Sequence, residues 1–159
     1  MQDLKINWYF HHFSELTLGQ LYDLLAERQR VFIIEQTCLF PDIDGLDQKS
    51  WHLLGYSKLE DGSQLVAYSR ILPAGLSFAE ASIGRIITSK RARGTGAGIE
   101  LMEESIRHLE KMWGKVPIKI GAQEYLIKFY RKFGFEIVDE PYVEDGIPHV
   151  HMLRQGGGL

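Results

Sequence analysis

Apolar residues recur at helical spacing near the start of the chain, after a short segment, 5–10, that predicts a first strand. Thr17 is suited to cap this helix, and its apolar residues continue every three or four positions to about residue 35. The next segment, 37–49, contains Pro41, Gly45 and several aspartates, a composition that predicts a surface loop. Loops of this length in compact domains are often functional.

The middle of the chain predicts strands followed by a helix. Apolar segments at 51–56, 65–72 and 82–88 indicate three strands, and an Asp-Gly pair between the first two is typical of a hairpin turn. Farther along, one apolar stripe at helical spacing is formed by Met102, Ile106, Leu109 and Trp113. Gly114 is suited to end that helix.

The last third of the chain predicts a buried strand at 116–120 and a helix at 124–133, closed by Gly134. Two closing strands are expected at 135–138 and 149–153. This order of elements predicts an α/β fold of the mixed α+β kind. We expect a central mixed, mostly antiparallel sheet flanked by helices.

Composition indicates an ordinary globular protein. A length of 159 residues predicts one domain, which we place at 1–154, with a flexible glycine-rich tail at 155–159. The net charge of -3 provides no basic stripe for a nucleic acid. The N-terminus lacks a signal-peptide pattern, and no apolar run approaches the roughly 20 residues that cross a bilayer. The single cysteine, Cys38, fits a reducing compartment, so we expect a cytoplasmic protein without a membrane partner.

A glycine-rich turn joins the strand at 82–88 to the helix after it. Gly94, Gly96 and Gly98 allow backbone N–H groups to approach a phosphate, and the N-terminus of the helix adds positive potential. Two arginines just before the turn add further charge. The strand-turn-helix context favours an anion site over the alternative, a flexible loop.

The two common nucleotide-binding motifs do not fit this turn. A P-loop requires Lys and then Ser or Thr after its last glycine, where this chain has Ile99 and Glu100. The dinucleotide fingerprint, Gly-x-Gly-x-x-Gly, fails from either starting glycine, because Ile99 or Leu101 stands at its last position. The phosphate ligand is therefore of another kind.

The segment from Arg93 to Met102, Arg-Gly-Thr-Gly-Ala-Gly-Ile-Glu-Leu-Met, resembles the Arg-x-x-Gly-x-Gly signature of GNAT acyltransferases. A match that starts at Arg91 is also present, but it misplaces the Leu-Met pair that usually follows. In this family the turn holds the pyrophosphate of coenzyme A, and the preceding strand end pairs with pantetheine. The resemblance therefore implies contacts with coenzyme A by Ile86, Ile87, Thr88, Arg93, Gly94, Thr95, Gly96, Ala97 and Gly98.

A second segment, from Gln123 to Phe135, resembles the GNAT pattern Asn-x-x-Ala-x-x-x-Tyr-x-x-x-Gly-Phe. Gln123 replaces the usual asparagine and retains an amide for coenzyme A, and Leu126 replaces the usual small residue. The match implies that Tyr130 lies beside coenzyme A and acts as general acid toward the departing thiolate. The alternative is a helix tyrosine whose ring packs in the core.

Further segments are similar to those of the ElaA-like branch of GNAT proteins, and together they span nearly the whole chain. They are Glu35-Gln36, Asp42-Ile-Asp44-Gly45, His52, Ile83-Gly-Arg85 and Glu144-Asp145-Gly146-Ile147-Pro148-His149. The resemblance implies the GNAT fold and acetyl-CoA as co-substrate. It implies an amine acceptor, on a small molecule or a peptide, without identifying it, and homodimers are common in the family.

The acceptor amine needs a base, because an ammonium group cannot attack a thioester. The candidates are His52, His149, Glu35 and Glu80. His149 begins the last predicted strand and is of a type that titrates near neutral pH, so His149 and Glu35 are the leading pocket residues. His52 is either a residue of the substrate pocket or a hydrogen-bonded residue at a strand edge.

Arg70 and Arg85 lie on predicted central strands, where an arginine requires a partner. They form either an ion pair with a buried acid such as Glu35 or a clamp for a substrate carboxylate. The aspartates of the 37–49 loop attract an amine or are simply solvated. They lack the spacing of an EF-hand, and we expect no metal.

We therefore expect an N-acetyltransferase in which the amine attacks acetyl-CoA directly, so that Cys38 is not needed as a nucleophile. Two alternatives remain open. One is a non-catalytic module that binds and senses acyl-CoA, and the other is a transferase that uses a different acyl donor.

Overall fold

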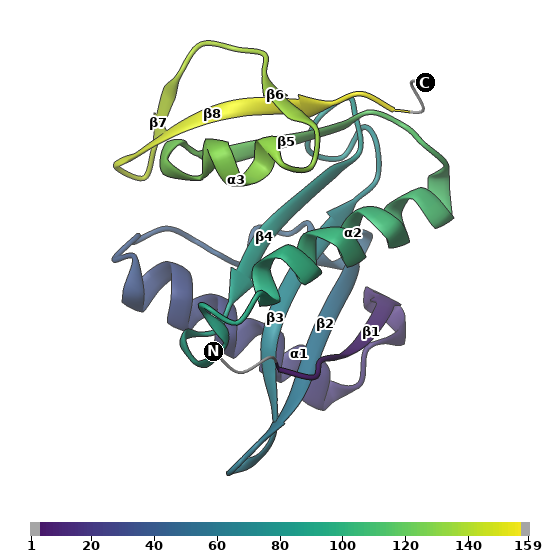
Figure 1. The fold of residues 1–159 in the computed structure, drawn as a ribbon, viewed down its shortest axis with the longest axis vertical. Helices are drawn as coiled ribbons and strands as arrows, with labels where there is room; N and C mark the ends of the chain where they lie inside the picture. The colour runs from purple at the N-terminus through teal and green to yellow at the C-terminus, as the bar shows by residue number, and fades with distance from the viewer. Residues whose placement is uncertain (1–3, 157–159) are drawn as a thin grey trace.

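The computed structural model describes residues 4–156 as two antiparallel sheets, one with helices on both faces and the other with α3 against one face (Figure 1). The strands are β1 (Asn7–His12), β2 (Trp51–Leu59), β3 (Gly62–Leu72), β4 (Ser82–Thr88), β5 (Ile118–Gln123), β6 (Phe135–Ile137), β7 (Tyr142–Glu144) and β8 (Ile147–Arg154). The α-helices are α1 (Leu18–Arg28), α2 (Ala97–Trp113) and α3 (Ile127–Arg131). A π-helical segment, Gln29–Glu35, extends α1, and 3₁₀ turns occur at Phe13–Glu15, Asp47–Lys49, Lys90–Ala92 and Glu124–Leu126.

The sheets meet at a single point. The N-terminal sheet has the order β1-β2-β3-β4, and in the C-terminal sheet β8 pairs with β5, β6 and β7. Ala81 and Ile118, at the starts of β4 and β5, form a parallel bridge. Among the described residues no further pairing joins these strands, so β4 and β5 separate beyond the bridge.

The N-terminal sheet is apolar on both faces, because a helix covers each one (Figure 1). On one face, Leu53 and Ile83 pack with Leu101 and Met102 of α2. On the other face, Leu54, Tyr68 and Ile87 pack with Leu24 of α1. The neighbours Leu53 and Leu54 thus enter different cores, as the alternation of side chains along a strand requires.

The local signals in the sequence explain where the helices begin and end. Thr17 caps α1 in a capping box with Gln20, with both hydrogen bonds at 3.0 Å. Gly96 and Gly114 bound α2, and both adopt the left-handed φ values that favour glycine, 88° and 81°. The predicted stripe of α2 and its C-cap are therefore confirmed.

Several boundaries differ from the sequence prediction. The helix expected at 124–133 is a 3₁₀ turn followed by the five-residue α3, and the strand expected at 116–120 is shifted to β5. The pattern missed β7, because three residues are too few to show alternation. The predicted fold class, a mostly antiparallel sheet flanked by helices, is confirmed.

At the C-terminus, Gly156 packs against the backbone of Lys115 and Val116. The remainder of the predicted tail, 157–159, lies outside the described residues. Among residues 4–156 no helix has the length and apolar character required to cross a membrane.

Candidate functional site

A cavity of about 700 Å³ lies where β4 and β5 separate. Both strands line it, together with the π-helical segment after α1, the loop after that segment, the start of α2, α3 and the β7–β8 hairpin. Seven residues predicted to contact coenzyme A line this cavity: Ile86, Ile87, Thr88, Arg93, Gly98, Gln123 and Tyr130. Segments far apart in the sequence are thus brought to one cavity.

The glycine-rich turn lies at the end of the cavity nearest α2. Arg93 and Gly98 line the cavity, and residues 94–97 between them form the turn without lining it. Gly94 and Gly96 have φ values of 80° and 88°, so both need the freedom of glycine. The first N–H groups of α2 lack intrahelical acceptors, and they are available to an anion at this turn.

Tyr130 reaches the cavity from α3 and is only 5% exposed. Its ring packs edge-on against Phe129 and Phe135, which accords with the core interpretation. Burial, with a further contribution from Tyr125, raises the pKa of its phenol, so the hydroxyl stays protonated near neutral pH. Tyr130 lines the cavity, so its hydroxyl is placed to donate to a ligand there.

His149 of β8 also lines the cavity and is 7% exposed. Its Nδ1 donates to the carbonyl oxygen of Ile147 at 2.7 Å, because a carbonyl can only accept. In the neutral imidazole, the lone pair is therefore on Nε2, which lies 3.7 Å from a carboxylate oxygen of Glu144. This is the arrangement of a group able to accept a proton and to be stabilised once charged.

Two further polar contacts cross the cavity. Glu35, at the end of the π-helical segment, accepts a 2.6 Å hydrogen bond from Arg93. Its neighbour Gln36 accepts from the amide of Gln123 at 3.3 Å. The end of the first helical region is thus connected to the glycine-rich turn and to β5.

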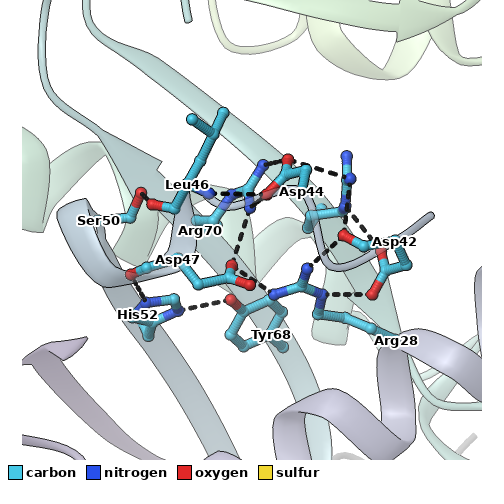
Figure 2. Close-up of polar contacts among 10 residues, drawn as sticks. Arg28, Asp42, Asp44, Leu46, Asp47, Ser50, His52, Tyr68 and Arg70 are labelled. Carbon is cyan, nitrogen blue, oxygen red and sulfur yellow. Dashed lines mark hydrogen bonds and ion pairs between the residues drawn. The ribbon is translucent and has the colours of Figure 1, made fainter. Parts of the chain in front are cut away.

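A closed ring of ion pairs fixes the loop after the π-helical segment (Figure 2). In order around the ring, its members are Arg28, Asp42, Arg85, Asp44, Arg70 and Asp47. Each arginine pairs with two aspartates and each aspartate with two arginines, at N–O distances between 2.7 and 3.3 Å. Burial opposes ionisation of Asp44, but hydrogen bonds from Arg70 and a backbone amide lower its pKa to about 2.

Arg85 joins this ring through an irregularity in β4. The register between β3 and β4 shifts after Tyr68, and Arg85 adopts a left-handed φ of 49°. Such a bulge redirects a side chain, and a non-glycine residue in this conformation is strained by roughly 1–2 kcal/mol. The hydrogen bonds from Arg85 to the side chain and carbonyl of Asp42, at 2.8 and 3.1 Å, offset that cost.

Comparison with known proteins now identifies the family. Residues 52–155 match the family model described as an acetyltransferase (GNAT) domain. The chain belongs to the GNAT acetyltransferase family. It is 42% identical to protein ElaA of Escherichia coli over 152 residues, 94% of this chain and 97% of that protein. It is 39% identical to a UPF0039 protein of Synechocystis over 150 residues, 94% and 96% of the two chains.

Solved structures agree with this assignment. An acyl-CoA N-acyltransferase from Pseudomonas aeruginosa superposes with a TM-score of 0.87 at 39% identity, over 94% of this chain and 99% of that one. Escherichia coli ElaA gives 0.86 at 42% identity, over 95% and 100%. A Bacillus subtilis acetyltransferase solved in complex with CoA shares the fold, with a TM-score of 0.59 at 19% identity, over 95% and 99%. This GNAT chain is therefore an acyltransferase.

Two residues expected in the substrate pocket lie elsewhere in this GNAT chain. His52 is fully buried and does not line the cavity: it accepts from the hydroxyl of Tyr68 at 2.7 Å and donates to the carbonyl of Asp47 at 3.0 Å. Arg70 is 3% exposed and is held in the ring, so its role is structural. Of the two arginines only Arg85 lines the cavity.

The acidic loop was also misinterpreted from the sequence. Its aspartates neither attract an amine nor extend into solvent, since they pair with arginines from α1, β3 and β4. The arginines of the sheet therefore pair with these aspartates, whereas Glu35 pairs with Arg93. The signal in the sequence was the matching number of charges: three aspartates on one loop, and three arginines on predicted helices and strands where an arginine needs a partner.

Sequence reasoning assigned no role to several residues that line the cavity. These are Phe32, Gln36, Cys38, Phe40, Gly121, Glu144 and Asp145. Three of them stand in segments that carry the ElaA-like resemblance, Gln36, Glu144 and Asp145. Within residues 4–156 no cluster of three or more His, Cys, Asp or Glu residues is arranged to hold a metal ion.

The burial of His52 predicts a specific dependence of stability on pH. Burial lowers the pKa of this imidazole from 6.5 to about 4, against the opposing effect of the Asp47 carbonyl. Below pH 6.5 the unfolded chain therefore binds a proton that the folded chain does not. The free energy of unfolding falls as the pH drops from about 6.5 to about 4, by at most about 3 kcal/mol from this group.

Urea unfolding at a series of pH values measures this effect. His52→Gln should flatten the dependence between pH 6.5 and 5, where few carboxylates titrate. His11→Gln, which removes the imidazole directly opposite on β1, should keep it. An equal slope in the wild type and His52→Gln would contradict the assignment.

Proposed function

We propose that this chain transfers an acetyl group from acetyl-CoA to a primary amine, which attacks the thioester directly in the cavity between β4 and β5. The observation that carries the proposal is one cavity that has the glycine-rich turn at its end and is lined by a protonated buried phenol and an imidazole with a free lone pair. Donor binding, proton donation and proton removal are therefore all available in one place.

The donor is held by the glycine-rich turn and the end of β4. The pyrophosphate accepts hydrogen bonds from the N-terminal N–H groups of α2, and pantetheine runs along Ile86, Ile87 and Thr88. A Bacillus subtilis acetyltransferase with the same fold was solved in complex with CoA, which is consistent with a CoA donor in this proposal. Gln123 lies across the cavity on β5, where its amide contacts the donor chain.

In the proposed reaction, acyl transfer is coupled to two proton transfers. The amine nitrogen forms a bond to the acetyl carbonyl carbon, and the carbon–sulfur bond breaks. The amine loses a proton to Nε2 of His149, and Tyr130 donates its phenolic proton to the departing sulfur. The imidazolium formed at His149 is stabilised by the carboxylate of Glu144, 3.7 Å away.

We assign the base to His149 and not to Glu35, although both line the cavity. Glu35 accepts a 2.6 Å hydrogen bond from Arg93, so its carboxylate is already occupied by a guanidinium, whereas within the described part of the chain Nε2 of His149 has no hydrogen bond to a donor. Cys38 takes no covalent part, because burial and the nearby Asp145 raise the pKa of its thiol. The proposal includes an acceptor amine on a small molecule or a peptide. It also includes a cytoplasmic location and a homodimer.

The first test concerns the donor site. An added Cβ at Gly98 would lie 3.8 Å from the ring of Phe129, so alanine fits the fold, but it would project into the cavity toward the donor. Gly98→Ala should lower the affinity for acetyl-CoA about tenfold, or about 1.4 kcal/mol. The stability should not fall, because alanine favours a helix by about 1 kcal/mol over glycine.

Gly19→Ala is the matched control, since Gly19 is also the second residue of its helix and an added Cβ there has similar room. Titration calorimetry and thermal unfolding separate the two effects. If Gly98→Ala binds acetyl-CoA with unchanged affinity, the donor does not bind at this turn.

The second test concerns proton donation. Tyr130→Phe keeps the ring packing and removes only the hydroxyl, so kcat should fall about 100-fold with a much smaller change in the KM for acetyl-CoA. Thiol release from acetyl-CoA with an amine acceptor measures both constants, and Tyr22→Phe, an exposed tyrosine on α1, is the control. Wild-type turnover in Tyr130→Phe would exclude it as the acid.

A further inference from the structure

The ring of ion pairs has a structural side and a cavity side. Its three carboxylates all come from one loop, whereas its arginines come from α1, β3 and β4. Arg28 and Arg70 are buried away from the cavity, and Arg85 alone among the ring members lines it. An ion pair to Arg85 therefore transmits the position of the loop to the cavity.

The guanidinium of Arg85 also packs on Phe32 and Phe40, two side chains that form an aromatic wall of the cavity. It lies over the rings of Phe40 and Phe32, at 5.4 and 6.0 Å from their centroids. Phe40 belongs to the loop and Phe32 to the π-helical segment, so one side chain joins both to the bulge of β4. Ile86, which follows Arg85 directly, belongs to the donor part of the cavity.

We propose that Asp42 is a positioning residue of the acceptor site, which acts through Arg85 to hold the loop wall against β4. It bonds to Nε of Arg85 with its carboxylate and to Nη2 with its backbone carbonyl. The substrate part of this inference rests on the proposed acyl transfer. The effect on the wall itself does not depend on it.

Asp47 provides the matched control for Asp42. Each aspartate is buried, belongs to the same loop and bridges two arginines of the ring. Asp47 contacts Arg28 and Arg70 but not Arg85. Asp42→Asn and Asp47→Asn should therefore destabilise the fold by similar amounts in thermal unfolding, and only the first should disturb the cavity.

Cys38 reports the position of the wall without any need for substrate. It is the only cysteine of the chain, is 5% exposed, and lines the cavity four residues before Asp42. Under native conditions iodoacetamide should alkylate Cys38 about tenfold faster in Asp42→Asn than in the wild type, because local opening exposes the thiol. In Asp47→Asn the rate should stay within about twofold of the wild type. Mass spectrometry follows the reaction.

Steady-state kinetics give the second readout, with spermidine, tyramine and lysine amide as acceptors. For the amine that the wild type uses best, Asp42→Asn should raise the KM about fivefold and change kcat less than about twofold. Calorimetry should find the affinity for acetyl-CoA unchanged in both variants. If Asp42 had a purely structural role, Asp42→Asn would lower the stability without raising KM selectively over kcat.

If Asp42→Asn does not fold, Arg85→Lys and Arg70→Lys make the same comparison, because each keeps a positive charge in the ring. Arg85→Lys should accelerate alkylation, and Arg70→Lys should not. Equal rates within either pair would overturn the proposal. If the wild type uses none of the amines, the proposed acyl transfer to these acceptors fails, and the alkylation rates still decide whether Asp42 holds the wall.

Discussion

The closed ring of three arginines and three aspartates is the constraint on which the loop side of the cavity depends. Its charges cancel, and the members are mostly buried, so removal of one partner leaves another charge uncompensated. The cost of breaking such a buried pair is about 3–5 kcal/mol. The ring, drawn in Figure 2, attaches an otherwise irregular loop to α1, β3 and β4 at once. This loop forms one wall of the cavity.

The glycine-rich end of the cavity depends on a different and more local principle. A strand, a turn with two left-handed glycines and the start of α2 place backbone N–H groups at one end of the cavity. The two ends share one cavity because, within residues 4–156, β4 and β5 are joined only by the bridge between Ala81 and Ile118 and then separate. Tyr130 and His149 reach the space between them from α3 and β8, on the C-terminal sheet. The fold thus supplies the cleft, and the ring and the turn define its two ends.

The difference between local features, such as the turn, and the long-range ring explains what the sequence could predict. The turn at Gly94 and Gly96 and the stripe of α2 are encoded by neighbouring residues, and the structure contains both. The segment around Tyr130 is also local, but its predicted helix is shorter than expected. The ring could not be predicted, because its partners are 14 to 43 residues apart and meet only after the sheet forms. The prediction of His52 as a pocket residue is wrong for a related reason. Its hydroxyl and carbonyl partners come from β3 and from the loop, so its burial depends on tertiary packing.

The central claim is that the cavity transfers an acyl group and does not merely bind acyl-CoA. The most direct measurement is the release of free thiol from acetyl-CoA with and without a panel of primary amines, together with mass spectrometry of the amine. The account predicts amine-dependent thiol release, with one acetylated amine formed per thiol and no acetyl group left on Cys38. Tight binding of acetyl-CoA without amine-dependent release, or accumulation of acetylated Cys38, would contradict it.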